Sequence, residues 1–156
     1  IYTYSVILFA MILFAGIGSF LSERLRTTGS WWARIPVGIA ILVLLVSFLI
    51  QSVVEASLSL PLLVRALAVI SCIAPVSLLL GFCFPLGLRV VASFSESATA
   101  WMWGVNGACG VIASILSVVV SMWVGIHANL YVAATLYLLL TLPAGALVRR
   151  SRARVA

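Results

Sequence analysis

Apolar residues along this chain form long continuous runs and do not alternate with polar ones. An α-helix needs about 20 apolar residues to cross a bilayer, whereas membrane-spanning strands are shorter and alternate. The pattern predicts five helical spans, at residues 2–20, 35–50, 61–88, 100–124 and 130–147. We therefore expect residues 1–156 to form a single transmembrane domain, an all-α, polytopic helix bundle.

Proline and short polar segments predict the ends and bends of these helices. Pro36 fits the first turn of the second span, where a missing N–H costs nothing. Pro75 and Pro85 lie inside the third span, and each removes one backbone hydrogen bond, so a kink or tilt is expected. The segments between the later spans are predicted as a loop or short surface helix, a connector and a tight turn, at residues 51–60, 93–99 and 125–129.

The composition excludes an ordinary soluble domain. Hydrophobic residues make up 65% of the chain and charged residues only 8%, with a mean hydropathy of +1.32. The net charge of +6 comes from arginine alone, because the sequence has no lysine. A basic chain can bind nucleic acid, but these arginines flank apolar runs. We expect membrane lipid as the partner and no nucleic acid.

The arginines fall on one side of the predicted topology. If five spans alternate, one side holds Arg24, Arg26, Arg34, Arg89, Arg149, Arg150, Arg152 and Arg154. The other side holds Arg65 alone. Positive residues mark the cytoplasmic face, so the N-terminus is expected outside and the C-terminus in the cytoplasm. Four or six spans would scatter the arginines over both sides.

The residues that carry chemistry in other proteins form no recognisable set here. Cys72, Cys83 and Cys109 lie in apolar runs without metal-ligand spacing and are interpreted as small apolar side chains. His127 is interpreted as a polar loop residue. We therefore predict no catalytic, cofactor-binding or metal site in this chain. Because the chain begins with Ile1, we expect it to be a piece of a longer protein.

The fourth span carries a stripe of small residues. At 100° per residue the stripe falls within an arc of about 80°. Its members are Gly107, Gly110, Ser114, Ser117, Ser121 and Gly125. Small residues let helices in lipid approach closely, so the stripe predicts a helix-packing seam. The alternative, a polar track for a solute, would want ionisable residues, and the stripe has none.

Four residues near the junction of the third and fourth spans form a possible functional or kink site: Gly81, Pro85, Trp103 and Asn106. Asn106 is strongly polar for its place inside a span, which favours a hydrogen bond to another helix or to a carbonyl freed by a kink. A contact with a substrate is the alternative. Trp103 either anchors the membrane interface or covers the helix contact.

The motif G-x-x-F-P-x-G-L-R at residues 81–89, followed by A-W-x-W-G-x-N-G-A at residues 100–108, resembles a known family. It is similar to the membrane part of bacterial polytopic spermidine synthase-like proteins, in which helices are fused to an aminopropyltransferase-like domain. The stretch of residues 5–21 resembles an earlier helix of the same part. The resemblance implies the bacterial inner membrane and a fused soluble domain or other membrane chains as partners.

Two functions are left open by the sequence. The first is a non-catalytic membrane domain or accessory subunit that anchors a soluble domain or packs within a larger membrane complex. The alternative is a portion of a transporter for a polyamine or related metabolite, favoured by the helix with two prolines. That alternative lacks a buried carboxylate for a cationic substrate, since Glu55 and Glu96 fall near the predicted surfaces. An enzyme is not expected from this chain alone.

Overall fold

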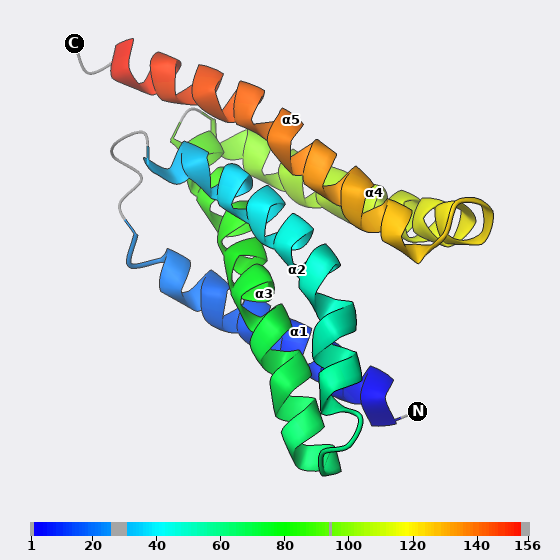
Figure 1. Ribbon diagram of the computed structural model, residues 1–156. Helices are drawn as coiled ribbons and strands as arrows, with labels where there is room; N and C mark the ends of the chain where they lie inside the picture. Colours follow the sequence, from blue (N-terminus) through cyan, green and yellow to red (C-terminus); the bar gives the residue numbers. More distant parts are fainter. Residues whose placement is uncertain (1, 26–30, 94, 154–156) are drawn as a thin grey trace.

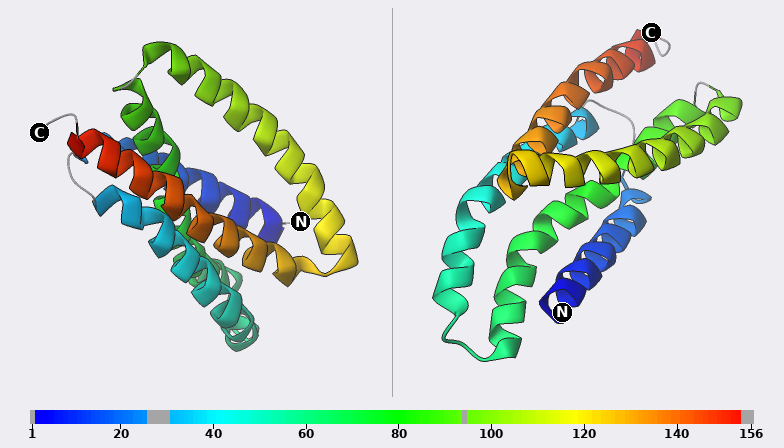
Figure 2. Two further views of the ribbon diagram at one scale, coloured as in Figure 1. Left: turned by 90° about the horizontal axis from the view of Figure 1, so that it is seen from above. Right: turned by 90° about the vertical axis from the view of Figure 1, so that its right-hand side faces the viewer.

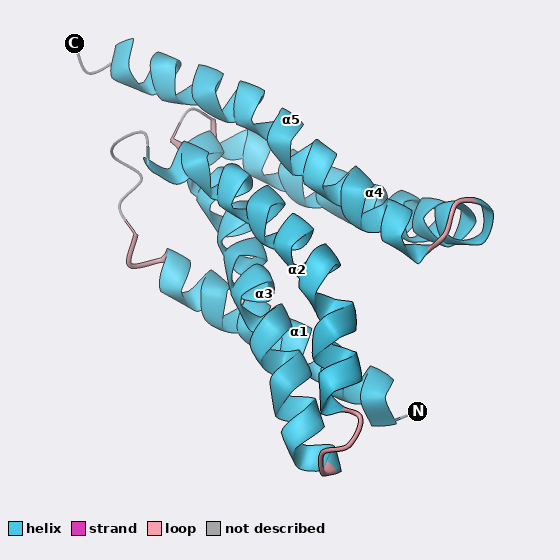
Figure 3. Ribbon diagram, in the orientation of Figure 1, coloured by secondary structure: helices cyan, strands magenta, loops and turns pink. Residues whose placement is uncertain are grey.

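The computed structural model describes residues 2–25, 31–93 and 95–153, and this part of the chain is helical apart from short turns (Figure 3). Five of its helices are long and apolar enough to cross a membrane. A short 3₁₀ turn, η1, leads into the second of them. In chain order the elements are α1 (Tyr2–Ser22), η1 (Trp31–Arg34), α2 (Ile35–Ser57), α3 (Leu62–Ala92), α4 (Glu96–Trp123) and α5 (Ile126–Ala153).

The all-α prediction is confirmed, but three predicted connections are shorter than the polar residues suggested. Residues 51–57 continue α2, where Gln51 Nε2 donates to Glu55 Oε1 at 3.0 Å one helical turn away. Helix α4 begins at Glu96, inside the predicted connector, and α5 begins at Ile126, inside the predicted turn. Polar side chains at helix ends can point outward without breaking the helix, so polarity alone ended α2 seven residues too early and began α4 and α5 four residues too late.

Proline and glycine lie at a helix start, inside a bent helix and at a tight turn, where their backbone conformations are suited. Pro36 lies in the first turn of α2, as predicted. Pro75 and Pro85 lie inside α3, which continues through both and bends along its length in Figure 2. Gly125 has a φ of +102°, which glycine adopts at little cost, and it turns the chain between α4 and α5. Gly125 therefore serves the turn, and the helical part of the small-residue stripe ends at Ser121.

Four helices form a ring, and the fifth packs outside it. Helix α2 contacts α3 and α5, and α4 also contacts α3 and α5, more sparsely. Helix α1 packs on α3 in the most extensive contact between helices. Figures 1 and 2 show that the α2–α3 turn and the α4–α5 turn lie far apart. The ring is therefore open on the side of these two turns, opposite the end where the last residues of α1, α3 and α5 lie.

The buried core lies between α2, α3 and α5. One cluster is centred on Ile39, Ala40, Val43 and Ala134, and a second joins Trp32, Leu86, Val90 and Ala144. Most other large apolar side chains, on every helix, are exposed. A soluble protein rarely exposes so much apolar surface to water. Exposure of these side chains to lipid costs no free energy, because lipid tails are as apolar as the side chains.

Glycine sets the distance between α1 and α3. A Cβ added at Gly81 would overlap the carbonyl oxygen of Ala15 and lie 2.9 Å from the Ser19 nitrogen. A Cβ added at Gly18 would overlap the carbonyl oxygen of Leu78 and lie 3.3 Å from the Gly81 Cα. The two backbones therefore touch directly, which is how helices associate in lipid through small residues.

Arginine closes the end of the same contact. The Arg89 guanidinium, on α3, donates from Nη1 to the carbonyl oxygens of Glu23 and Leu25, both at 3.3 Å, and from Nη2 to that of Ser22. The last carbonyls of a helix have no partner within the helix, and a cation there also meets the negative end of the helix dipole. Arg89 thus caps α1 from a neighbouring helix.

Candidate functional site

A half-open cavity of about 540 Å³ lies between α2, α3, α4 and α5. Each helix contributes one face, because the lining residues recur at three- and four-residue intervals. Helix α3 contributes Leu80, Cys83, Phe84, Leu86, Gly87 and Val91; α4 contributes Met102 and Asn106; α5 contributes Tyr137, Leu140, Pro143 and Ala144; and Trp32, Ile35 and Pro36 complete the lining. The cavity is therefore built into the helix packing.

The chemistry of the lining is apolar with a few neutral polar groups. The polar side chains are the Asn106 amide, the Tyr137 hydroxyl, the Cys83 thiol and the Trp32 indole N–H. Among the described residues that line it, none carries a carboxylate, an imidazole or a guanidinium. Such a lining suits a largely apolar ligand and offers a cation no counter-charge.

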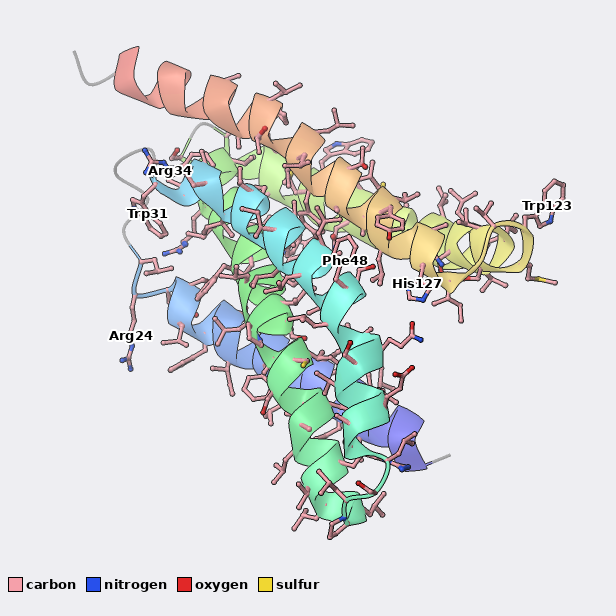
Figure 4. The ribbon with its side chains drawn as sticks, viewed as in Figure 1. Arg24, Trp31, Arg34, Phe48, Trp123 and His127 are labelled. Atoms are coloured by element: carbon pink, nitrogen blue, oxygen red, sulfur yellow. The ribbon has the colours of Figure 1, made fainter. Side chains whose placement is uncertain are left out.

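The cavity lies toward one end of the molecule, which we call the arginine end and define by Arg24, Arg34 and Arg89. Trp32 lies in η1, three residues before the start of α2, and Val91 comes one residue before the end of α3. Figure 4 shows Arg24, Trp31 and Arg34 at this end and Trp123 and His127 at the other. Helix α5 also ends on this side (Figure 1). Arg26 and Arg154 lie outside the described residues, as do the side chains of Arg149, Arg150 and Arg152.

The structure separates the four residues of the predicted functional or kink site. Asn106 lines the cavity, and among the described residues no hydrogen bond to its amide is present. Trp103 packs edge-to-face on Phe84, with ring centroids 4.8 Å apart, so it joins α4 to α3. Gly81 contacts α1 and faces away from the cavity. Pro85 lies half-buried inside α3.

Within the part of the chain that the structure describes, the small-residue stripe on α4 meets no other helix over most of its length. A Cβ added at Gly107 or Gly110 would have no atom within 4 Å beyond its own helix. The Ser114 and Ser117 hydroxyls donate to carbonyls of their own helix, at 2.8 and 3.3 Å. Only near the turn does the stripe find a partner within the chain. The predicted seam therefore stays a prediction that needs a partner beyond this chain.

The partner near the turn is Asn129, at the start of α5. Its amide nitrogen donates to Ser121 Oγ at 2.6 Å and to the Ser117 carbonyl oxygen at 3.0 Å. These two bonds fasten the α4–α5 hairpin at its closed end. The predictions from sequence did not single out Asn129, because it was assigned to the turn.

The remaining reactive side chains are dispersed. The thiols of Cys72, Cys83 and Cys109 are unpaired. Within the described residues no three His, Cys, Asp or Glu side chains lie close enough together to hold a metal ion. His127 is exposed in the first turn of α5. The site with the most developed geometry is therefore the apolar cavity.

Sequence reasoning missed Gly87 and Tyr137 as cavity residues and Arg89 as a helix cap. A signal for Gly87 existed in the i, i+3, i+7, i+11 spacing of Leu80, Cys83, Gly87 and Val91, which places them on one face of α3. No pattern within a single helix indicates which other helices that face will meet.

The chain was compared with known proteins at three levels. No protein-family model, no curated protein sequence and no solved structure matches it.

Proposed function

We infer that this chain is a non-catalytic membrane module that holds another membrane protein chain, or a further part of its own protein, against α4. The single observation that carries this proposal is the exposure of α4. No residue in the span Ser97–Trp123 is buried by the rest of the described chain. A helix that only faced lipid would not need a stripe of glycine and serine on one face, since leucine would serve there equally well.

The contact between α1 and α3 supports the proposal, because it shows what such residues do in this protein when a partner is present. Gly18 and Gly81 bring two backbones into contact. Gly107 and Gly110 offer the same absence of side chains with nothing opposite them. A partner helix with small residues of its own would fit this face.

The proposed setting is the bacterial inner membrane, with the arginine end in the cytoplasm. The gathering of Arg24, Arg34 and Arg89 at one end supports this orientation, since positive residues are retained on the cytoplasmic side. The resemblance of residues 81–108 to spermidine synthase-like membrane proteins makes a fused aminopropyltransferase-like domain one candidate for the part that is held. The proposal does not depend on that resemblance.

Transport of a polyamine is the second candidate, and one observation favours it. Asn106 lines a cavity beside α3, a bent helix with two internal prolines, and polar groups beside irregular helices line the sites of many transporters. The lining described above has no carboxylate, however, and a polycation in a membrane needs one. The lining therefore favours the packing function.

A pair of photo-crosslinking positions on α4 tests the packing function. Ser114 lies on the stripe, and Ile112 lies roughly 160° away around the helix. A photoreactive residue at Ser114, in the full protein in its native membrane, is expected to crosslink to a protein segment. The same residue at Ile112 is expected to crosslink to lipid.

A second change makes the result specific. Gly110→Leu adds a side chain to the stripe and should abolish the crosslink from Ser114 without changing the amount of protein in the membrane. Equal protein crosslinking from Ser114 and Ile112, or none from Ser114, would overturn the proposal.

A further inference from the structure

We propose that the cavity between α2, α3, α4 and α5 holds one acyl chain of an anionic phospholipid, whose phosphate group lies at the arginine end beside Arg34. This inference rests on the proposed membrane location and is independent of any partner for α4. Its grounds are the length of the cavity, the chemistry of its wall and the charge at its rim.

The length of the cavity matches one leaflet of a bilayer. Along α3 the lining runs from Leu80 to Val91, eleven residues apart. At 1.5 Å per residue this is about 16 Å, and half of a hydrocarbon core of about 30 Å is about 15 Å. The shallow end, at Trp32 and Val91, is the end where the arginines gather. An acyl chain that enters there reaches the deep end near Leu80.

The wall of the cavity suits hydrocarbon. Leu80, Phe84, Leu86, Met102 and Leu140 present apolar surface, and the polar groups on the wall are all neutral. A polycation would have to enter without a counter-charge, and a phosphate would lose its hydration without a cation to meet it inside. Only the apolar part of a lipid therefore belongs in the cavity.

The charge at the rim selects the headgroup. Arg34 is exposed and lies in sequence between Trp32 and Ile35, both of which line the cavity. Arg89 already donates to the α1 carbonyls, and Arg24 lies over the Phe20 ring at 5.8 Å. Glu23, exposed one residue beyond the end of α1, is the described carboxylate at this end. Of the guanidinium groups that the structure describes at this end, Arg34 is thus the one best placed to meet a lipid phosphate.

Gly87 provides the variant that tests the cavity. It lines the cavity, and a Cβ added there would have no atom within 4 Å beyond its own helix. Gly87→Leu therefore fills the space without a clash against backbone. Gly16 is a matched control, since it too lies inside a helix with nothing within 4 Å of an added Cβ, but it is outside the cavity.

The experiment measures lipid binding by native mass spectrometry of the full chain purified in mild detergent. The probes are dioleoylphosphatidylglycerol and dioleoylphosphatidylcholine, added singly. The unaltered protein is expected to bind one phosphatidylglycerol about fivefold more tightly than phosphatidylcholine, the effect of about one arginine near a lipid phosphate. Gly87→Leu should weaken binding of both lipids about tenfold or more, and Gly16→Leu should change neither.

Arg34→Gln separates the headgroup from the chain. It should remove the preference for phosphatidylglycerol while leaving phosphatidylcholine binding unchanged. Size-exclusion chromatography and circular dichroism confirm that each variant is folded. Binding by Gly87→Leu equal to that of the unaltered protein would overturn the proposal, as would retention of a non-lipid molecule in the cavity. Either result leaves the crosslinking test of α4 intact, so the two proposals fail separately.

Discussion

The contact between α1 and α3 and the free face of α4 carry the same kind of residue with opposite outcomes. In the first, Gly18 and Gly81 bring two backbones together, and Arg89 caps the end of α1. In the second, Gly107 and Gly110 face open space. Small residues therefore give a helix the capacity for close contact, and the rest of the fold decides whether the chain itself supplies the partner.

The largest expected effect comes from adding one methyl group to the closed contact. Gly81→Ala places a Cβ against the Ala15 carbonyl oxygen, so one of the two helix backbones must shift at this point. We expect a loss of about 2–3 kcal/mol in the free energy of unfolding in detergent, because backbone atoms cannot rotate aside. Gly16→Ala, on the neighbouring face of α1, is the control and should cost less than about 0.5 kcal/mol. Equal stability of the two variants would show that the helices do not touch at Gly81.

An intermediate effect is expected at the arginine that caps α1. Arg89→Gln removes the charge that meets the carbonyls of Ser22, Glu23 and Leu25. Hydrogen bonds from a charged donor contribute about 1.5–3 kcal/mol. Because the Arg89 guanidinium is partly exposed, we expect the free energy of unfolding to fall by about 1.5 kcal/mol. The rate of amide hydrogen exchange at residues 22–25 should rise in the same variant. Arg89→Lys keeps the charge but loses the planar group, so it should recover part of the stability and no more.

The smallest effect is expected on the open face. Gly107→Ala adds a Cβ that meets nothing within the described chain, and alanine is the better helix former by up to about 1 kcal/mol. The purified monomer should therefore keep or slightly gain thermal stability. A loss comparable to that of Gly81→Ala would show that a segment of the same chain covers this face, and the contrast between the two regions would disappear.

Features that depend on one helix could be predicted from the sequence, and features that depend on a second helix could not. The apolar runs, Pro36 and the polar breaks predicted five helices and most of their extent, because a helix in lipid must satisfy its hydrogen bonds within its own residues. Asn106 stood out for the same local reason, as a polar group in an apolar run. The sequence did not indicate that Gly81 brings α3 against α1, because the residue that it contacts, Ala15, lies sixty-six residues earlier in the chain.

The sequence by itself determined the number of helices, their apolar surfaces and the concentration of arginine in three of the connecting and terminal segments. Each follows from the cost of leaving a polar backbone group or a charge in hydrocarbon, which a single segment meets alone. The tertiary structure alone decided that α1 packs on α3, that four helices line a half-open cavity, and that the described chain leaves the glycine face of α4 uncovered. Lipid is as apolar as the side chains it surrounds, so hydrophobicity does not select among helix pairs, and only close fit between particular surfaces does.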